Sequence, residues 1–171
     1  MISAKMEEAL REQVNAEIYS AYLYLSMSSW FEAENLSGFA GWMKAQATEE
    51  MVHAMKIYDY VIERGGRMLL TAIEAPPSEW ENPVAAFTAT LEHERKVTAL
   101  INNLVEVALA EKDHAAQIFL QWFVSEQVEE EASVDAVLQK LKMIGGQGHG
   151  LFMMDRELGS RTAPVALPAA E

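Results

Sequence analysis

Residues 65–81, GGRMLLTAIEAPPSEWE, separate two pairs of long segments in which apolar residues recur with the 3.6-residue period of a helix. Only a few residues join the two segments within each pair, so the helices of a pair must run antiparallel. Seventeen residues can stretch roughly 55 Å at about 3.3 Å each. A helix of about 28 residues is only about 42 Å long. The stretch can therefore cross a whole bundle and let the second and third helices run parallel.

This connection predicts an all-α fold, a four-helix bundle with one long crossover loop. The four helices are expected at about 3–34, 37–64, 83–110 and 114–144, and a short amphipathic stretch at 151–158 predicts a fifth, C-terminal helix. Turn and cap residues at 35–37 separate the first two helices.

The bundle and its fifth helix form one expected domain over residues 1–160, followed by a mobile tail at 161–171 that is rich in Pro and Ala. Leu69, Leu70, Ile73 and Trp80 make the crossover too apolar for a solvated loop, so it is expected to pack on the bundle.

The amino-acid composition excludes several kinds of site and disfavours several kinds of partner. The 171 residues include no Cys, which excludes disulfides, thiolate metal sites and a cysteine nucleophile. No apolar run reaches 18 residues and no secretory leader is recognisable, so we expect a soluble, cytoplasmic protein with no membrane partner. A net charge of −13 disfavours nucleic acid as a partner and attracts metal cations.

Five polar residues interrupt the apolar stripes, each near the middle of its helix: Glu17, Glu50, His53, Glu94 and Glu130. The middles of the helices coincide in a bundle whichever way they run, so these side chains should meet at one level of the core. A buried carboxylate is costly unless a cation neutralises it. Glu50 and His53 lie three residues apart, which places both on one helix face and lets both bind one ion.

The charge of this group fits two metal ions. Four carboxylates carry −4, which two divalent cations would neutralise. Oxygen and imidazole ligands point to iron, manganese, zinc or magnesium, and a shell with a single imidazole suits Fe²⁺ and stabilises Fe³⁺. A single glutamate on an apolar stripe is more often a residue at the edge of the core, with its methylene groups on apolar surface and its carboxylate in solvent, than a buried metal ligand.

Three stretches carry a family resemblance: EEMVH at 49–53, the His93-Glu94 pair, and FLQWFVSEQVEEE at 119–131. Together they resemble the bacterial non-haem ferritins, of the ferritin-like di-iron family, over residues 1 to about 160. The resemblance implies a homo-oligomeric shell of twenty-four copies that stores and detoxifies iron. Each subunit would be a ferroxidase that oxidises Fe²⁺ with O₂ or H₂O₂ at a di-iron centre, and ferric mineral would fill the cavity.

The resemblance also assigns the ligands. Glu17 and His53 resemble ligands of the first iron, Glu50 the bridging ligand, and Glu94 and Glu130 ligands of the second. Gln127 stands where haem-containing bacterioferritins have the Glu of a second Glu-x-x-His pair. This difference argues against a bacterioferritin and leaves the second metal, beside Gln127, with fewer strong ligands.

Three further acidic residues flank this group. Glu49, Glu126 and Glu129, together with Glu130, resemble the third iron site of bacterial ferritins, which lies toward the cavity. A solvated acidic face is the alternative for each of them.

Two aromatic residues and one methionine occupy positions of interest in the family. Tyr24 resembles the tyrosine beside the centre that can give up an electron, and Trp122 has a weaker claim of the same kind; core packing explains either without a redox role. Met51 occupies the haem-ligand position of bacterioferritins, but non-haem relatives carry Met there too, so no haem is expected.

The remaining features have plainer interpretations. His93, His114 and His149 are expected at the surface or at contacts. Residues 150–158 resemble the short helix that lines the fourfold axis of the cage, the alternative being a helix packed on its own subunit.

Three other functions compete with storage. A di-iron oxidase or peroxide reductase without storage usually carries two Glu-x-x-His pairs, whereas this chain has one. The others are a DNA-protecting mini-ferritin shell and a structural bundle without metal.

Overall fold

The computed structural model describes residues 1–145 and 148–160, and over these it is entirely helical. The helices are α1 (Ala4–Ala33), α2 (Ser37–Glu63), α3 (Pro83–Ala110), α4 (His114–Met143) and α5 (Gly148–Leu158). The predicted fold class is confirmed. The tail expected at 161–171 lies outside the described residues, so the boundary at residue 160 stays a prediction.

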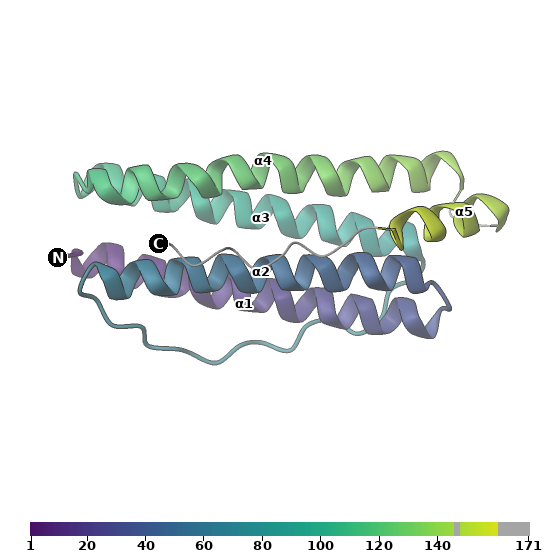
Figure 1. Ribbon diagram of the computed structural model, residues 1–171, viewed down its shortest axis with the longest axis horizontal. Helices are drawn as coiled ribbons and strands as arrows, with labels where there is room; N and C mark the ends of the chain where they lie inside the picture. The colour runs from purple at the N-terminus through teal and green to yellow at the C-terminus, as the bar shows by residue number, and fades with distance from the viewer. Residues whose placement is uncertain (146–147, 161–171) are drawn as a thin grey trace.

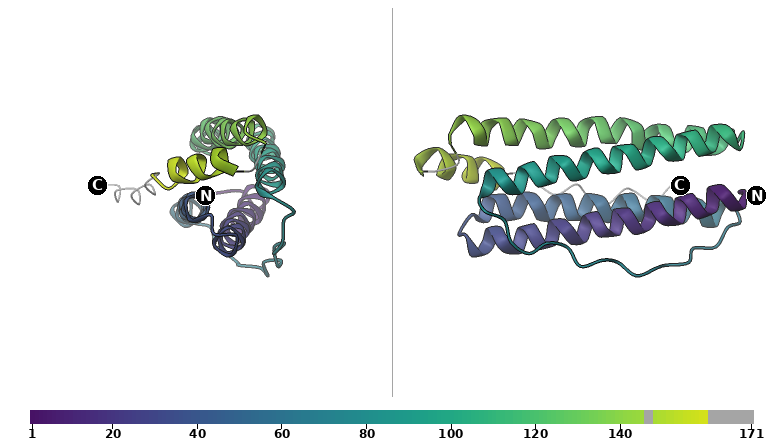
Figure 2. Two further views of the ribbon diagram at one scale, coloured as in Figure 1. Left: turned by 90° about the vertical axis from the view of Figure 1, so that its right-hand side faces the viewer. Right: turned by 180° about the vertical axis from the view of Figure 1, so that it is seen from behind.

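The two helical hairpins pack side by side to form the bundle (Figure 1). The right-hand view of Figure 2 shows the connection after α2 running back along the whole bundle before α3 begins. The helices α2 and α3 are therefore parallel, as the length of the connection predicted.

Side chains of α1 hold the crossover against the bundle at several levels. Arg11 Nε donates to Arg67 O at 2.8 Å, Asn15 Nδ2 to Thr71 Oγ1 at 2.8 Å, and Ser26 Oγ to Pro77 O at 2.6 Å. Trp80 packs edge-on against Trp30, with ring centroids 5.8 Å apart. The sequence predicted that apolar side chains hold the crossover on the bundle, but Leu69 and Leu70 remain 48% and 68% exposed. Hydrogen bonds from α1 therefore contribute much of the attachment.

The N-terminus of α2 is capped from a distant part of the chain. The turn lies at Glu34 and Asn35, and α2 begins at Ser37. The N-cap position is Leu36, whose side chain cannot accept a hydrogen bond. Asp155 of α5 does so instead: its Oδ1 accepts from Gly38 N at 2.8 Å and from Phe39 N at 3.1 Å. The local cap predicted from the sequence is therefore wrong, and α5 completes the end of α2.

Helix α5 packs on its own bundle, where Met154 and Leu158 are buried. A Cβ atom at Gly38 would lie 1.7 Å from the backbone oxygen of Asp155, so only glycine allows this close approach. The other face of α5 leaves Phe152 and Met153 at 63% and 50% exposed. The packing expected as the alternative for this helix is present, and its place at a fourfold axis stays a prediction.

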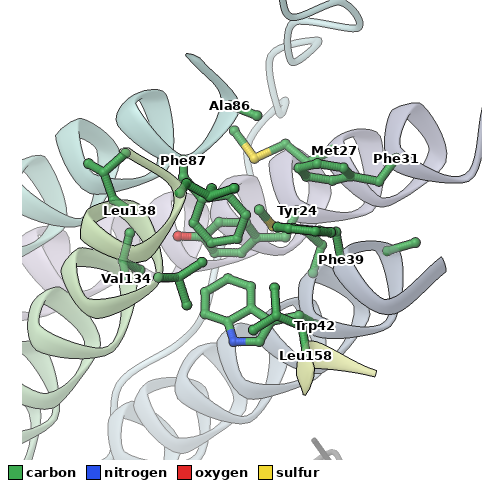
Figure 3. Close-up of a cluster of buried hydrophobic side chains, with 14 of the residues drawn as sticks. Tyr24, Met27, Phe31, Phe39, Trp42, Ala86, Phe87, Val134, Leu138 and Leu158 are labelled. Atoms are coloured by element: carbon green, nitrogen blue, oxygen red, sulfur yellow. The ribbon is translucent and has the colours of Figure 1, made fainter. Parts of the chain in front are cut away.

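The core consists of two apolar clusters separated along the bundle. One gathers aromatic residues such as Tyr24, Phe31, Phe39 and Phe87 near α5 (Figure 3). The other lies toward the opposite end. On every long helix a buried polar segment separates the residues of one cluster from those of the other. Among the described residues no helix is both long and apolar enough to cross a membrane.

Candidate metal centre

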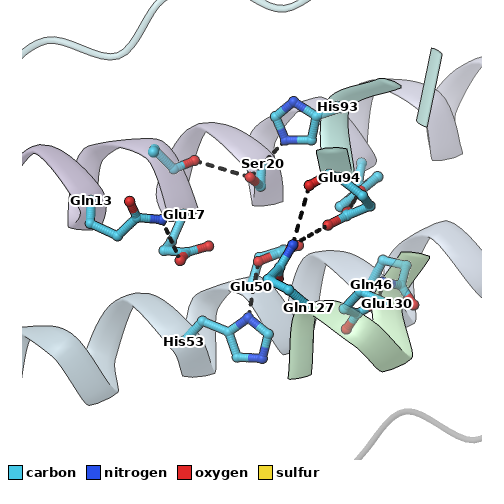
Figure 4. A network of polar contacts seen from close by, with 12 residues as sticks. Gln13, Glu17, Ser20, Gln46, Glu50, His53, His93, Glu94, Gln127 and Glu130 are labelled. Atoms are coloured by element: carbon cyan, nitrogen blue, oxygen red, sulfur yellow. Dashed lines mark hydrogen bonds and ion pairs between the residues drawn. The ribbon is translucent and has the colours of Figure 1, made fainter. Parts of the chain in front are cut away.

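The five predicted ligands all lie in the polar level between the two apolar clusters (Figure 4). All are nearly inaccessible, with exposed fractions of 1% for Glu17, 2% for Glu50, 5% for His53, 0% for Glu94 and 7% for Glu130. The helical period places each side chain inward, and the shared height follows from the central position of each residue in its helix.

Glu17, Glu50 and His53 form the tightest group. Each offers one ligand atom, and these three atoms lie within 4.8 Å of one another. His53 Nδ1 is 3.2 Å from Glu50 Oε2, and the imidazole packs edge-on against Trp122, with ring centroids 5.4 Å apart. Two carboxylates and one imidazole at this spacing are a ligand set that one divalent cation could satisfy.

One oxygen of this group has no partner. Glu17 Oε1 accepts from Gln13 Nε2 at 2.9 Å, whereas Glu17 Oε2 is buried without any hydrogen bond. An unpaired carboxylate oxygen in a protein core costs free energy. A cation beside Glu50 and His53 would remove this cost.

Glu94 and Glu130 complete the level from the second hairpin. Glu94 accepts a hydrogen bond from the phenol of Tyr24, and Gln127 Nε2 donates to its other oxygen at 3.2 Å. Gln46 Nε2 donates to Glu130 Oε2 at 2.7 Å. Tyr24 is thus in direct contact with the carboxylate group, and Gln127 faces Glu94 with its amide nitrogen.

Burial raises the pKa values of Glu50, Glu94 and Tyr24. Desolvation is the main cause that raises the pKa of Glu50, and the neighbouring charges of Glu94 and Glu17 add to it. Desolvation also raises the pKa of Glu94 to about 7, although the hydrogen bond from Tyr24 opposes the shift. Burial, followed by the charge of Glu94, raises the pKa of Tyr24 well above 10.0. A metal ion that binds here would therefore compete with protons on Glu50 and Glu94.

Fixed positive charge is absent from the heart of this group. Over residues 1–145 and 148–160, no lysine or arginine forms an ion pair with Glu17, Glu50 or Glu94. Buried carboxylates without a cationic side chain are the pattern expected of metal ligands. The donors, all oxygen and imidazole nitrogen, fit iron as well as other hard divalent ions.

The three flanking glutamates lie at the edge of the centre. Glu49 and Glu126 are half-buried and Glu129 is exposed. Desolvation raises the pKa of Glu126, opposed by His53 and reinforced by Glu129 and Glu49, so these charges share one neighbourhood. The arrangement is compatible with both the third iron site and the acidic face that the sequence left open.

His93 takes the second of its two expected positions, at a contact rather than at the surface. It is partly buried, and its Nε2 lies 2.8 Å from Ser20 Oγ. Its ring packs near those of Tyr19 and Tyr24, with centroids 5.8 and 6.1 Å away. Burial, with a contribution from Lys96, lowers its pKa to about 4. His114 and His149 are exposed, as predicted.

Two glutamines of the centre received no role from the sequence. Gln13 and Gln46 are 3% and 0% exposed, and each donates to a predicted ligand. A signal was present, because each stands four residues before a ligand glutamate on the same helix. A glutamine on an apolar stripe is nevertheless compatible with many partners, and only the structure shows which carboxylate it contacts.

Comparison with known proteins places this geometry in a family. The ferritin-like domain of the ferritin family matches residues 7–144. A bacterial non-heme ferritin of Bacteroides fragilis is 48% identical, covering 94% of this chain and all of that protein. A bacterial non-heme ferritin of Escherichia coli is 36% identical over 94% of this chain and 97% of that protein.

Solved structures agree. A ferritin of Archaeoglobus fulgidus, engineered into a closed form, superposes with a TM-score of 0.95 at 55% identity, covering 96% of this chain and all of that one. The open-pore ferritin of the same archaeon gives a TM-score of 0.93 at 56% identity, over 95% of this chain and all of that one. The bundle, its buried carboxylate centre and these matches show that the chain belongs to the ferritin family.

Proposed function

We propose that this protein stores and detoxifies iron in the cytoplasm. Each subunit acts as a ferroxidase: it binds two Fe²⁺ ions at the buried carboxylate centre and passes their two electrons to O₂ or H₂O₂. Glu17 and His53 hold the first iron, Glu50 bridges, and Glu94 and Glu130 hold the second. The ferric product then moves into the cavity of a 24-subunit shell.

The observation that carries this proposal is the unpaired oxygen of Glu17 beside Glu50 and His53. A bundle without a metal function would be more stable with apolar residues in these places. Retaining four carboxylates and an imidazole in the core is therefore best explained by cations that bind there.

The remaining predicted residues have roles around this pair. Tyr24, bonded to Glu94, is placed to supply an electron to the centre. Gln127 assists at the second iron, and Glu49, Glu126 and Glu129 with Glu130 receive a third iron on the way to the cavity. Met51 is 41% exposed in the single chain, and we expect no haem there.

Storage requires an assembly, and the single chain exposes apolar surface that an assembly would cover. Leu70 in the crossover and Phe152 in α5 are 68% and 63% exposed, and Met143 is 84% exposed. Burying such groups between subunits would stabilise an oligomer. This exposure favours the shell over a monomeric di-iron oxidase or peroxide reductase. The ligands all come from one chain, which disfavours a mini-ferritin.

Native mass and iron content measured on the same protein test the proposal. Twenty-four copies of a 19.1 kDa chain give about 458 kDa. Size exclusion with light scattering should show one species near that mass, and the same peak should carry iron after aerobic addition of Fe²⁺. A mass below about 100 kDa at micromolar protein, or a large shell that retains no iron, would contradict storage.

A further inference from the structure

The two glutamines without an assigned role contact carboxylates of two different metal positions. Gln13 lies on α1 and donates to Glu17, which belongs to the first position. Gln46 lies on α2 and donates to Glu130, which belongs to the second. Both side chains are buried, at 3% and 0% exposed. A buried amide is costly without a hydrogen bond, so these contacts need an explanation.

Gln13 leaves one particular oxygen of Glu17 available. The amide nitrogen holds Glu17 Oε1 at 2.9 Å across one helical turn, while Glu17 Oε2 has no hydrogen bond. A carboxylate fixed through one oxygen cannot rotate freely. Its other oxygen is therefore kept ready for the cation that Glu50 and His53 would share.

Gln46 acts between helices. Its amide nitrogen reaches from α2 to Glu130 Oε2 on α4, at 2.7 Å (Figure 4). Glu50, the proposed bridging ligand, follows Gln46 by one turn on the same helix. The contact therefore ties a carboxylate of the second position to the helix that carries the bridge.

The residue type matters as much as the contact. A lysine or arginine in either place would also hold the carboxylate. Its positive charge, however, would neutralise the carboxylate in place of the metal ion and lower the affinity of the centre for metal. An apolar residue would leave the carboxylate free to turn. A neutral amide orders the carboxylate and leaves its negative charge for the cation.

We propose that Gln13 and Gln46 are positioning residues with separate tasks: Gln13 orients Glu17 for the first metal, and Gln46 orients Glu130 for the second. The inference rests on the proposed function, because it assumes that metal binds at both positions. It adds that each position can be weakened independently through a residue that does not itself bind metal.

The test compares Gln13→Met and Gln46→Met in the assembled, metal-free protein. Methionine keeps the length and buried volume of glutamine and removes the amide donor. Zn²⁺, which is not oxidised, is titrated by calorimetry, and crystals soaked at limiting Zn²⁺ locate it by anomalous diffraction. Loss of such an outer partner typically costs about 10–100-fold in metal affinity.

We expect Gln13→Met to lose affinity in that range at the position beside Glu17 and His53, with the other position occupied as in the wild type. Gln46→Met should show the reverse pattern. Co²⁺ absorption, which reports ligand geometry, should change for the affected position only. Gln121→Met removes an exposed glutamine from α4 and should match the wild type in every measurement.

Three results would overturn the inference or its basis. Wild-type affinity in both variants means that the amides do not position the ligands, while the proposed metal centre stands. Equal weakening of both positions in each variant means a general packing effect. No Zn²⁺ at either position in the wild type contradicts the proposed function itself, and the inference with it.

Discussion

Tyr24 of α1 donates its phenolic hydrogen bond to Glu94 of α3, in the buried level where the two hairpins of the bundle meet. The contact joins an oxidisable ring to a proposed iron ligand. It also opposes the rise in the pKa of Glu94 that burial causes.

Tyr24→Phe should therefore change electron transfer at the centre more than it changes the stability of the fold. The ring keeps its place in the aromatic cluster, and the lost hydrogen bond costs about 1 kcal/mol. Two Fe²⁺ ions supply two electrons, enough to reduce O₂ only to H₂O₂, so removal of a further donor should increase the H₂O₂ released per O₂ consumed. An oxygen electrode combined with a peroxidase assay measures this ratio. Unchanged release of H₂O₂ would leave Tyr24 with packing alone.

The flanking glutamates give a second prediction. In Glu49→Ala with Glu126→Ala, two metal ions per subunit should still bind tightly and the third should be lost. Oxidation of the first two Fe²⁺ ions should continue, whereas the ratio of iron oxidised to O₂ and the later turnover should change. Anomalous diffraction from iron-soaked crystals decides the matter, since an undiminished third peak beside Glu129 and Glu130 would indicate a solvated acidic face.

The close approach of α5 to α2 gives a third prediction. In Gly38→Ala the new Cβ would lie 1.7 Å from Asp155 O, so α5 must move and the cap on α2 is lost. We expect destabilisation of at least about 2 kcal/mol and faster proteolysis within residues 148–158. Gly41→Ala is the matched control, because its Cβ meets nothing within 4 Å, and it should be neutral or stabilising. Equal thermal midpoints for Gly38→Ala and Gly41→Ala would contradict the packing of α5 against α2.

A fourth prediction concerns pH and the opposite end of the bundle. Arg64 Nη2 lies 3.0 Å from Asp113 Oδ2, and the same carboxylate caps α4 by accepting from Ala116 N at 3.0 Å. Burial alone would raise the pKa of Asp113, but the hydrogen bonds from Arg64 and Ala116 outweigh it and lower the pKa below 3.8.

Because the folded-state pKa is depressed, the stabilisation is complete above the unfolded value and is lost as the pH falls through the folded value. Asp113→Asn keeps a capping group and should cost about 1 kcal/mol at pH 7. Its difference from the wild type in thermal midpoint should shrink below pH 3.8. A difference that stays constant from pH 7 to pH 3 would mean that the charge of Asp113 has no such role.

The sequence was sufficient for the helices, the crossover and the five inward polar residues, because each depends on local period or on chain length. It was insufficient where partners are distant in the chain. Asp155 caps α2 from 117 residues away, and no local pattern at 35–37 reveals that. The same limit applies to Gln46 and Glu130, whose contact depends on how α2 faces α4.

His93 shows a further limit. The sequence does not distinguish whether a histidine next to a ligand glutamate is buried or lies at the surface. Its burial follows from the rotation of α3 against α1, which places it beside Ser20 at 2.8 Å. The apolar stripe of a helix is at least about 100° wide, so it does not fix that rotation closely enough to place one residue at its edge.

The central claim is that the buried level oxidises iron, and Glu50 is its most informative residue because it would contact both ions. Glu50→Ala should lose both metals, and His53→Ala should lose a neutral ligand of the first. Each substitution removes a ligand without creating an unpaired cation, so both shells should still assemble, which native mass will verify.

Stopped-flow absorbance after mixing two Fe²⁺ per subunit with the aerobic, metal-free shell tests the claim most directly. The wild type should show a fast ferric signal, and Glu50→Ala and His53→Ala should show only the slow rate of iron in buffer. Wild-type rates in an assembled Glu50→Ala shell would contradict the assignment of this centre.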